Sequence, residues 1–488
     1  MNIFLPILYA LLALFGLIIL IMIIKTVTLK PEKSEKSEEV TLYDFDENAL
    51  AEHLSEAVKI PTVSMVEEYK NNSQPFFRFH RYLEETYPLI HKTAEKTIIA
   101  DYSLVYRFKG ENAENLPACF LAHMDVVPAD DKNWTHPPFS GKIEDGFVYG
   151  RGAMDMKGHL IALMEAMEEL LRQGVKFNRD IYFCFGHDEE PGNSFDGAPN
   201  IVKYFEEKGI KFEFVLDEGG TITDGRALGL KKQIALIGIS EKGMGDIELS
   251  VEKPGGHASN PKAPTVVGTL CEAVSKLEKK PMRTRWTKAT KNTVKILATH
   301  AKGPLKFVLA NRAALSPLLK WAFTKISPMT NALVRTTFAP TMLWGSKARN
   351  VLPPIARANI NTRIITGQTM DDVVKYIKKV VGKDVKVELQ GYTNPTPEGD
   401  LSSFGYKSLI KTISELFPES APVPYLFIAA SDARFYFPLT NNVFRFGPFN
   451  VTLDEQKRIH GYDERLSIAD LKKAAQFFAR CIENTCVN

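Results

Sequence analysis

The sequence predicts an α/β protein in which helices sandwich a mostly parallel sheet, because strand-like apolar runs alternate with stretches of helical periodicity. The apolar runs lie at 118–122, 181–186 and 212–216, and the helical stretches at about 157–173 and 200–208. A second observation is the strict alternation of polar and apolar residues at 246–252, within a pattern that changes near residue 241. That alternation predicts a separate, half-buried antiparallel sheet.

Size and composition narrow the class of protein further. A chain of 488 residues with 44% hydrophobic content can bury a large core and is long enough for two or three domains. Its net charge of +3 provides no overall signature of nucleic-acid binding, so a small-molecule partner is expected. Five cysteines are few and odd in number, which argues against a disulfide framework.

The amino terminus predicts a membrane segment. Residues 4–24 are uncharged and apolar, and such a run of about 20 residues can cross a bilayer as a helix. We interpret residues 1–30 as a signal anchor, with a cleaved signal peptide as the alternative. The lysines that follow the span would favour a cytosolic location for that side. Residues 31–45 have almost no apolar content and are predicted to form a flexible tether.

The globular part begins near residue 46, and its first chemically informative motif follows the apolar run 118–122. The strand period of two places His123 and Asp125 on one face, where His123 can bind a metal while Asp125 accepts the other ring N–H. Asp155 comes after a glycine-rich turn and directly before the helix predicted at 157–173. Taken alone, an Asp at this position is more typical of a helix N-cap than of a metal ligand.

Acidic residues also follow the next two strands. Asp188, Glu189 and Glu190 crown the run 181–186, and unpaired carboxylates there would cost several kcal/mol in desolvation and repulsion. A dication offsets that cost, and because adjacent side chains diverge, one Glu can bind metal while the other acts as general base. A further acid pair, at 217–218, ends the run 212–216. Since parallel strands end at one edge, the pattern predicts a two-metal hydrolytic site.

Several motifs together resemble the co-catalytic zinc aminoacylase and carboxypeptidase family over roughly residues 46–485. Within it, the sequence is most similar to the carboxypeptidase S branch, which includes N-fatty-acyl-amino-acid synthase/hydrolases. The motifs are His123-x-Asp125, Gly-Arg-Gly-x-x-Asp-x-Lys-Gly at 150–158, Glu189-Glu190, Val-Leu-Asp-Glu-Gly-Gly at 215–220, Gly-Gly-His-Ala-Ser at 255–259, and the segments 329–337, 350–354, 361–364 and 458–465.

The resemblance implies two Zn²⁺ per chain with a shared bridging carboxylate. Asp155 would bridge the ions, and Glu189 would be the general base. The other implied ligands form two pairs: His123 with Asp217, and Glu190 with His460. Relatives differ over which acid of the last pair is the ligand; we prefer Asp217 and keep Glu218 as the alternative.

The resemblance also implies a zinc-peptidase-like fold with a smaller α+β lid domain inserted at 241–391, between catalytic parts at 46–240 and 392–488. In the lid, His257 is the expected donor to the oxyanion that forms during amide cleavage. Asn350 and Arg363 are candidates for binding the substrate carboxylate or oxyanion. An apolar insertion at 304–323 is consistent with packing inside the lid, an acyl-chain pocket or contact with a bilayer.

We therefore expect a zinc amidohydrolase that cleaves, and reversibly forms, the amide of N-acyl or N-fatty-acyl amino acids. Its substrate would carry a free carboxylate. By resemblance it would be membrane-anchored with a lumenal or extracellular catalytic domain, or secreted, and the lid would allow a homodimer. The alternatives are a carboxypeptidase acting on short peptides, a single-metal peptidase using His123 and Glu190, and a non-catalytic binding protein on the same fold.

Overall fold

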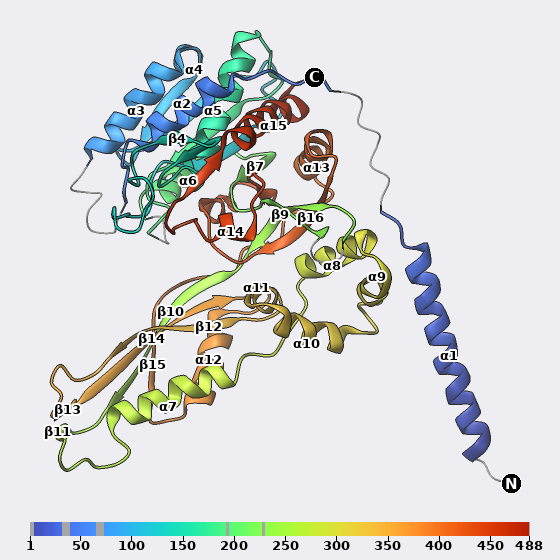
Figure 1. Cartoon of the computed structure of the whole chain (residues 1–488), viewed down its shortest axis with the longest axis vertical. Coiled ribbons are helices and arrows are strands. Elements are labelled where there is room, and N and C mark those ends of the chain that lie inside the picture. The colour runs from blue at the N-terminus through green and yellow to red at the C-terminus, as the bar shows by residue number, and fades with distance from the viewer. Residues whose placement is uncertain (1–3, 32–39, 65–72, 192–194, 227–229, 488) are drawn as a thin grey trace.

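A computed structural model describes residues 4–31, 40–64, 73–191, 195–226 and 230–487. It comprises a large α/β unit, a smaller α+β unit below it, and a long helix, α1 (Phe4–Thr28), that runs beside the body (Figure 1). Helix α1 is exposed along its length and is long and apolar enough to cross a membrane. The predicted tether includes residues 32–39, which lie outside the described part of the chain.

The large unit is built on a nine-stranded sheet of order β1-β2-β6-β3-β7-β17-β9-β16, in which β8 also pairs with β9. Strands β6, β3, β7 and β17 at its centre are parallel, so their carboxyl ends meet at one edge. The strands are β1 (Glu95–Ile99), β2 (Ser103–Phe108), β3 (Ala118–His123), β6 (Ile181–Gly186), β7 (Phe214–Asp217), β8 (Ile222–Thr223), β9 (Gln233–Glu241), β16 (Ser420–Phe427) and β17 (Val443–Arg445).

Helices cover both faces of this sheet, as predicted. Residues of α2, α3, α4, α5, α13 and α15 share one apolar core on one face, and α6 and η3 share another on the opposite face. These helices are α2 (Glu47–Val58), α3 (Gln74–Thr86), α4 (Pro88–Thr93), α5 (Lys157–Arg172), α13 (Phe404–Leu416), α15 (Ile468–Cys486), α6 (Gly197–Glu207) and η3 (Asp432–Tyr436). A small sheet of β4 (Lys142–Glu144), β5 (Phe147–Tyr149) and β18 (Arg465–Ser467) lies beside them, and α14 (Leu453–Gln456) precedes β18. All five cysteines are free thiols.

The smaller unit, here called the lid, is an antiparallel sheet of order β12-β14-β10-β15 with its own apolar core. Its strands are β10 (Gly243–Glu252), β12 (Thr337–Trp344), β14 (Ile355–Ile364) and β15 (Lys386–Thr393), and its helices are α7 (Val266–Lys279) and α12 (Met370–Val381). A two-stranded ribbon, β11 (Gly256–His257) with β13 (Val351–Leu352), forms the tip farthest from the catalytic sheet (Figure 1).

Four short helices between α7 and β12 do not pack inside the lid core. They are α8 (Lys288–His300), α9 (Gly303–Ala310), α10 (Ser316–Ile326) and α11 (Pro328–Ala332). Leu309 and Leu319 of this group share an apolar cluster with Val423 of β16, the edge strand of the catalytic sheet. Thr293 Oγ1 of α8 also donates to the Pro424 carbonyl at 2.6 Å. The 304–323 insertion therefore packs against α8 and the edge of the catalytic sheet, and not in the core of the lid sheet.

Candidate metal centre

The carboxyl edge of the catalytic sheet gathers histidines and acids from distant parts of the chain. His123 ends β3, Glu190 follows β6, and Asp155 lies in the turn before α5. Atoms of these three side chains that can bind a metal lie within 4.8 Å of one another. Parallel strand order explains the convergence, since each βα connection leaves the sheet at the same edge.

Asp155 lies at the middle of the cluster, between two histidines. Its Oδ1 is 3.2 Å from His123 Nε2, and its Oδ2 is 3.1 Å from His460 Nε2. His460 comes from the turn after α14 and has a left-handed backbone with φ of 59°, a conformation uncommon for a non-glycine residue. Each oxygen of one carboxylate thus faces a different imidazole, as expected of a ligand that bridges two ions.

Two further carboxylates complete the cluster on opposite sides. Glu190 Oε2 is 2.9 Å from His460 Nε2, and Glu218 Oε1 is 3.5 Å from His123 Nε2. The arrangement contains two His–Glu pairs, one on each side of Asp155. The other Glu190 oxygen, Oε1, is buried and has no hydrogen-bond partner among the described residues.

The structure departs here from the preference for Asp217 over Glu218. Asp217 Oδ1 accepts from the backbone N–H of Glu218 at 2.8 Å, and Asp217 Oδ2 accepts from that of Ala433 at 2.8 Å. Its carboxylate therefore organises backbone at the end of β7. The strand period of two explains the difference, because adjacent residues point to opposite faces and only Glu218 reaches His123.

Asp125 is fully buried and positions both His123 and the two glutamates. Its Oδ1 accepts from the backbone N–H of Glu189 at 3.2 Å, and its Oδ2 accepts from that of Glu190 at 3.0 Å and from Ser64 Oγ. His123 Nδ1 lies 3.0 Å from the Asp125 backbone oxygen and 3.4 Å from Oδ1. A proton held on Nδ1 leaves the Nε2 lone pair, on the side of Asp155, available to bind a metal ion.

Burial and crowding of acids dominate the electrostatics of the cluster. Burial, with the Asp155 charge, raises the pKa of Glu218 to about 8 and that of Glu190 to about 7. Burial also raises the pKa of Glu189 well above its usual range. Hydrogen bonds that His460 donates to the Asp155 and Glu190 carboxylates raise the pKa of His460 to about 10. Buried carboxylates at such density require positive charge nearby, which two dications would supply.

Comparison with known proteins agrees with this geometry. Residues 119–484 match the model of Peptidase family M20/M25/M40. The protein belongs to this family. The M20 protein is 40% identical over 453 residues to "Probable carboxypeptidase S-like 2" of Dictyostelium discoideum, covering 91% of this chain and 86% of that relative. It is 35% identical over 451 residues to "N-fatty-acyl-amino acid synthase/hydrolase PM20D1" of Xenopus tropicalis, covering 91% and 87%.

A solved structure supports the fold assignment. The M20 metallo-carboxypeptidase Sso-CP2 from Sulfolobus solfataricus superposes with a TM-score of 0.66 at 19% identity, covering 90% of this chain and 99% of that one. The chain is thus a metal-dependent hydrolase of the M20 family, and the expectation of an enzyme is confirmed over that of a binding protein. The expected zinc-peptidase-like α/β fold is also confirmed.

The residues of the M20 protein fit a metal centre by their chemistry. Imidazole nitrogens and carboxylate oxygens are ligands that zinc prefers in proteins. The buried Glu190 Oε1 lacks a described hydrogen-bond donor, and a buried anionic oxygen without a partner is costly. A cation between Glu190 and His460 would satisfy that oxygen.

Glu464 positions the Asp155 turn, a role that its place in the sequence does not reveal. It is fully buried, and its Oε1 accepts from the backbone N–H of Met154 at 3.0 Å and of Asp155 at 3.1 Å. Its Oε2 pairs with Arg151 Nη1 at 2.5 Å. Glu464 therefore holds the turn that presents Asp155. A buried arginine such as Arg151 requires an anionic partner, so a nearby carboxylate could be expected. The sequence does not indicate that this carboxylate is Glu464.

The structure does not bring His257 or Asn350 to the acid–histidine cluster. Both are exposed at the lid tip, where the Asn350 carbonyl accepts from the Ala258 backbone N–H at 3.0 Å. Arg363 lies at the other end of the lid, on β14, paired in register with Met244 near the connection to the catalytic unit. Its Nη1 is buried without a hydrogen-bond partner among the described residues, and burial, with nearby Arg434, lowers its pKa.

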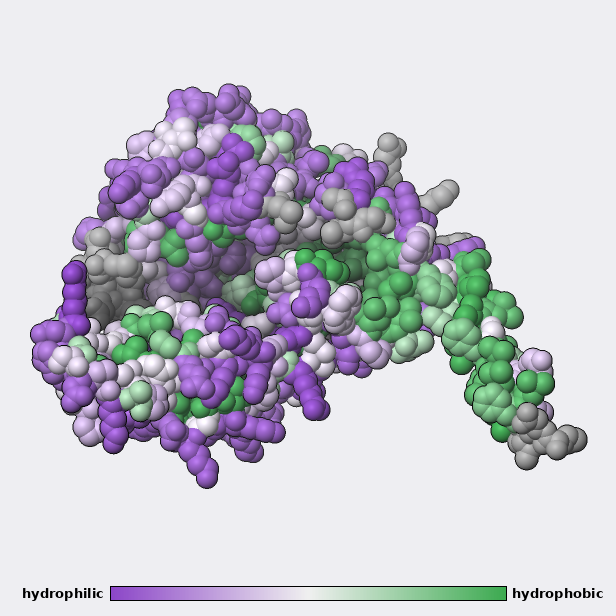
Figure 2. Space-filling view, turned by 60° about the horizontal axis from the view of Figure 1, so that its bottom comes forward, coloured by the Kyte–Doolittle hydropathy of each residue, from purple (hydrophilic) through white to green (hydrophobic). Residues whose placement is uncertain are grey.

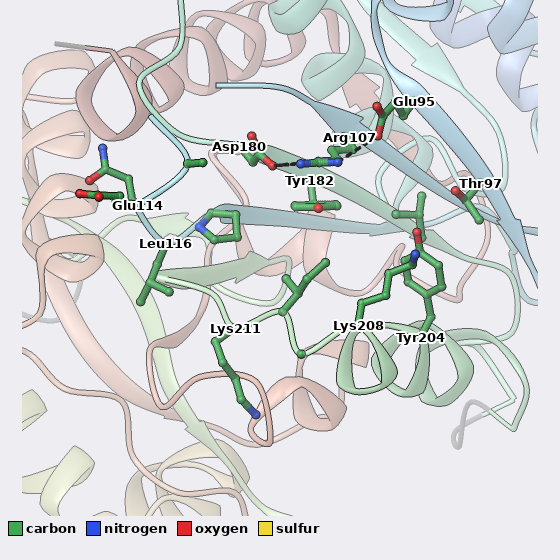
Figure 3. Close-up of a pocket in the computed structure, with 16 residues that line it drawn as sticks. Glu95, Thr97, Arg107, Glu114, Leu116, Asp180, Tyr182, Tyr204, Lys208 and Lys211 are labelled. Carbon is green, nitrogen blue, oxygen red and sulfur yellow. Dashed lines mark hydrogen bonds and ion pairs between the residues drawn. The ribbon is translucent and has the colours of Figure 1, made fainter. Parts of the chain in front are cut away.

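A separate cavity of 380 Å³ lies at the opposite edge of the catalytic sheet and contains none of the predicted site residues. Three of its charged groups are already paired with one another, as Figure 3 shows for Arg107, which lies between Asp180 and Glu95. Lys211 also donates to the Pro438 carbonyl at 2.7 Å. This cavity offers no cluster of metal-binding side chains.

Replacing each of the two neighbouring acids by its amide separates their roles. Glu218→Gln is expected to lower metal content and activity strongly, because an amide is a poor metal ligand and the pairing with His123 is lost. Asp217→Asn is expected to keep the metal but lose about 1–3 kcal/mol of stability, since one backbone N–H loses a charged acceptor. Metal analysis and thermal unfolding of both variants check this, and metal loss confined to Asp217→Asn would restore the original preference.

Proposed function

We propose that this protein is a dinuclear zinc amidohydrolase that cleaves, and in reverse forms, the amide bond of N-fatty-acyl amino acids. The observation that carries the proposal is the pair of His–Glu sites on either side of Asp155. Relatives named as N-fatty-acyl-amino acid synthase/hydrolases cover nearly the whole chain, which supports the substrate class.

In this proposal Asp155 would be shared by two zinc ions. His123 and Glu218 would hold one ion, and Glu190 and His460 would hold the other. When bound, the ions polarise the scissile carbonyl and lower the pKa of a water molecule toward about 7. Asp125 is a positioning residue, because it orients His123 and fixes the backbone that carries Glu189 and Glu190.

Glu189 is the proposed general base. Asp125 anchors the backbone N–H groups of both glutamates, while the Glu190 side chain turns toward His460. This leaves the Glu189 carboxylate to take a proton from water and deliver it to the leaving nitrogen. Burial raises the pKa of Glu189 well above its usual range, which helps the carboxyl group to hold the proton between its removal from water and its delivery to nitrogen. In the synthetic direction the same group removes a proton from the amino acid's nitrogen.

His257 is the proposed oxyanion donor, and its hydrogen bonds select the tautomer. The Ser259 backbone N–H donates to His257 Nδ1 at 3.2 Å, so Nδ1 is an acceptor and the proton lies on Nε2. Nε2–H is then a donor at the exposed lid tip. This donor can reach a bound amide in two ways: the lid of the same chain closes, or a second copy supplies its lid. We include the second way in the proposal, as a homodimer formed through the lid. Asn350 would join His257 at the oxyanion.

Arg363 is the proposed group that binds the substrate's free carboxylate. Its Nη1 is buried and has no hydrogen-bond partner among the described residues, so it is available as a donor. A carboxylate there would relieve repulsion from Arg434, whose charge lowers the Arg363 pKa. Both proposed reactions share this requirement, because N-acyl amino acids and peptides each end in a carboxylate.

A carboxypeptidase is the second candidate function. The relative at 40% identity is named as a probable carboxypeptidase S-like protein, and the same metal centre would serve a peptide's last amide bond. For location, we propose that α1 anchors the chain with the catalytic unit lumenal or extracellular, or that the protein is secreted after its removal. Helix α1 has the length and apolar character for either role.

A substrate panel tests the proposed function. With zinc present, the purified protein is expected to hydrolyse N-oleoyl-phenylalanine faster than N-acetyl-phenylalanine or a blocked dipeptide, measured as kcat/KM for phenylalanine release. It is also expected to form N-oleoyl-phenylalanine from oleate and phenylalanine. A preference for the blocked dipeptide would favour the carboxypeptidase instead.

A further inference from the structure

One long segment of the chain contains cations but no acids. Between Glu278 and Asp371 lie 92 residues with 17 lysines and arginines and no aspartate or glutamate, although the whole chain has 58 acidic residues. The small net charge of +3 therefore conceals a strongly basic segment. Such a segment favours an anionic partner.

Part of this segment also exposes large apolar side chains. They lie on α9, α10 and α11. We call these five side chains the docking surface: Leu305, Leu318, Trp321, Ile326 and Met329. Trp321 is 61% exposed and Ile326 65% exposed. Exposed apolar groups gathered on neighbouring helices are typical of a site that contacts another molecule or a membrane.

Lysines and an arginine accompany these apolar groups, on the same helices or directly beside them. They are Lys302, Lys306, Arg312, Lys320 and Lys325. None of them lies within 4.0 Å of a carboxylate in the part of the chain that the structure describes. Basic residues beside exposed Trp and Leu are the composition of helices that lie in a bilayer interface, where cations meet anionic headgroups.

The docking surface is joined directly to α1. Asn311 Nδ2, at the end of α9, donates to the Met22 carbonyl at 3.2 Å and to Thr26 Oγ1 at 3.0 Å. Leu29, just past α1, packs against the cluster that contains Leu309. Figure 2 shows hydrophobic surface continuing from α1 onto the adjoining helices. A bilayer crossed by α1 would therefore meet the docking surface where that helix leaves the apolar layer.

We propose that α9–α11 dock into the interface of an anionic bilayer beside α1. Trp321 and its apolar neighbours enter the headgroup region, and the lysines contact lipid phosphates. The site described above would then lie close to a membrane, where fatty-acyl amphiphiles concentrate. This inference depends on α1 inserting into a bilayer but not on the chemistry of the metal centre.

Fluorescence quenching in vesicles tests the proposal. Full-length protein is reconstituted into vesicles of phosphatidylcholine with brominated acyl chains and unbrominated phosphatidylglycerol, and flotation verifies that α1 has inserted. Brominated lipid is expected to quench tryptophan emission, and Trp321→Phe is expected to remove more than half of the quenched signal. Trp344→Phe is the matched control, because Trp344 is 45% exposed on β12 of the lid. Equal quenching in the two variants would overturn the proposal.

Charge is tested separately in the same vesicles. Quenching is expected to fall when the phosphatidylglycerol is omitted and the brominated phosphatidylcholine is kept, and also in the Lys320→Gln/Lys325→Gln variant. It is not expected to fall in a Lys203→Gln/Lys386→Gln control, whose lysines lie on α6 and β15. Equal quenching with and without anionic lipid would overturn the proposed headgroup contact. If the quenching of Trp321 instead falls as more protein is reconstituted per vesicle, whatever the lipid, a second copy of the chain covers the surface. That result would overturn the bilayer as its occupant.

Discussion

Asp155→Asn is expected to abolish amide hydrolysis and to remove bound metal from a folded protein. Within the described part of the chain, Asp155 is the one carboxylate within 4.0 Å of both His123 and His460, so losing its charge disrupts both proposed sites together. Metal analysis of the purified protein should give two zinc ions per chain for the wild type and fewer than one for the variant. Turnover should fall below detection.

Asp188→Asn is the matched control for that experiment. Asp188 is also buried at the same sheet edge, but its carboxylate accepts from the backbone N–H groups of Phe195, Asp196 and Gly197. Its substitution is expected to reduce thermal stability while metal content stays at the wild-type level. Full metal retention in Asp155→Asn would exclude Asp155 as the bridging ligand.

Glu189→Gln is expected to retain both metals and to lose about 10²–10⁴-fold in kcat, the range typical of a general acid–base residue. The amide has nearly the shape of the carboxylate but cannot accept the proton. Its backbone N–H keeps the bond to Asp125, so the neighbouring Glu190 stays in place.

The adjacent residue provides the contrast. Glu190→Gln is expected to lose metal, because Glu190 Oε2 is paired with His460 and Oε1 is buried without a described partner. Metal content and single-turnover rates measured on both variants distinguish the base from the ligand. Activity preserved in Glu189→Gln would contradict the proposed proton transfer.

Much of the catalytic unit was predictable because its signals are local. The apolar run 181–186 coincides with β6, and the helix predicted at about 157–173 is α5, Lys157–Arg172. Hydrophobic periodicity reports which face of an element is buried, and parallel order then places every strand's carboxyl end at one edge. For this reason His123, Asp155 and Glu190 converge as expected.

The choice between Asp217 and Glu218 was not predictable from spacing. Asp217 ends β7 and Glu218 follows it. Which of the two reaches His123 depends on which one accepts hydrogen bonds from nearby backbone N–H groups. The Ala433 N–H that binds Asp217 belongs to η3, more than two hundred residues later in the chain. Glu464 and Asp155 lie even farther apart in sequence, by 309 positions.

The position of the 304–323 insertion was also decided by tertiary contacts. Its apolar residues are consistent with several environments, and the sequence contains no local signal that distinguishes the lid core from the edge of the catalytic sheet. The structure places Leu309 and Leu319 against Val423 of β16, and Asn311 against α1. The neighbouring cations acquire their proposed role only from that placement.

The sequence by itself determined the α/β class, the family, and the residue types that crown the catalytic strands, because these depend on local periodicity and short motifs. Only the tertiary structure decided that Glu218 faces His123, that Glu464 holds the Asp155 turn, and that His257 lies at the lid tip away from the cluster. Each of these is a contact, or a separation, between segments far apart in the chain. Such relations are set by how whole elements pack, which no short window of sequence encodes.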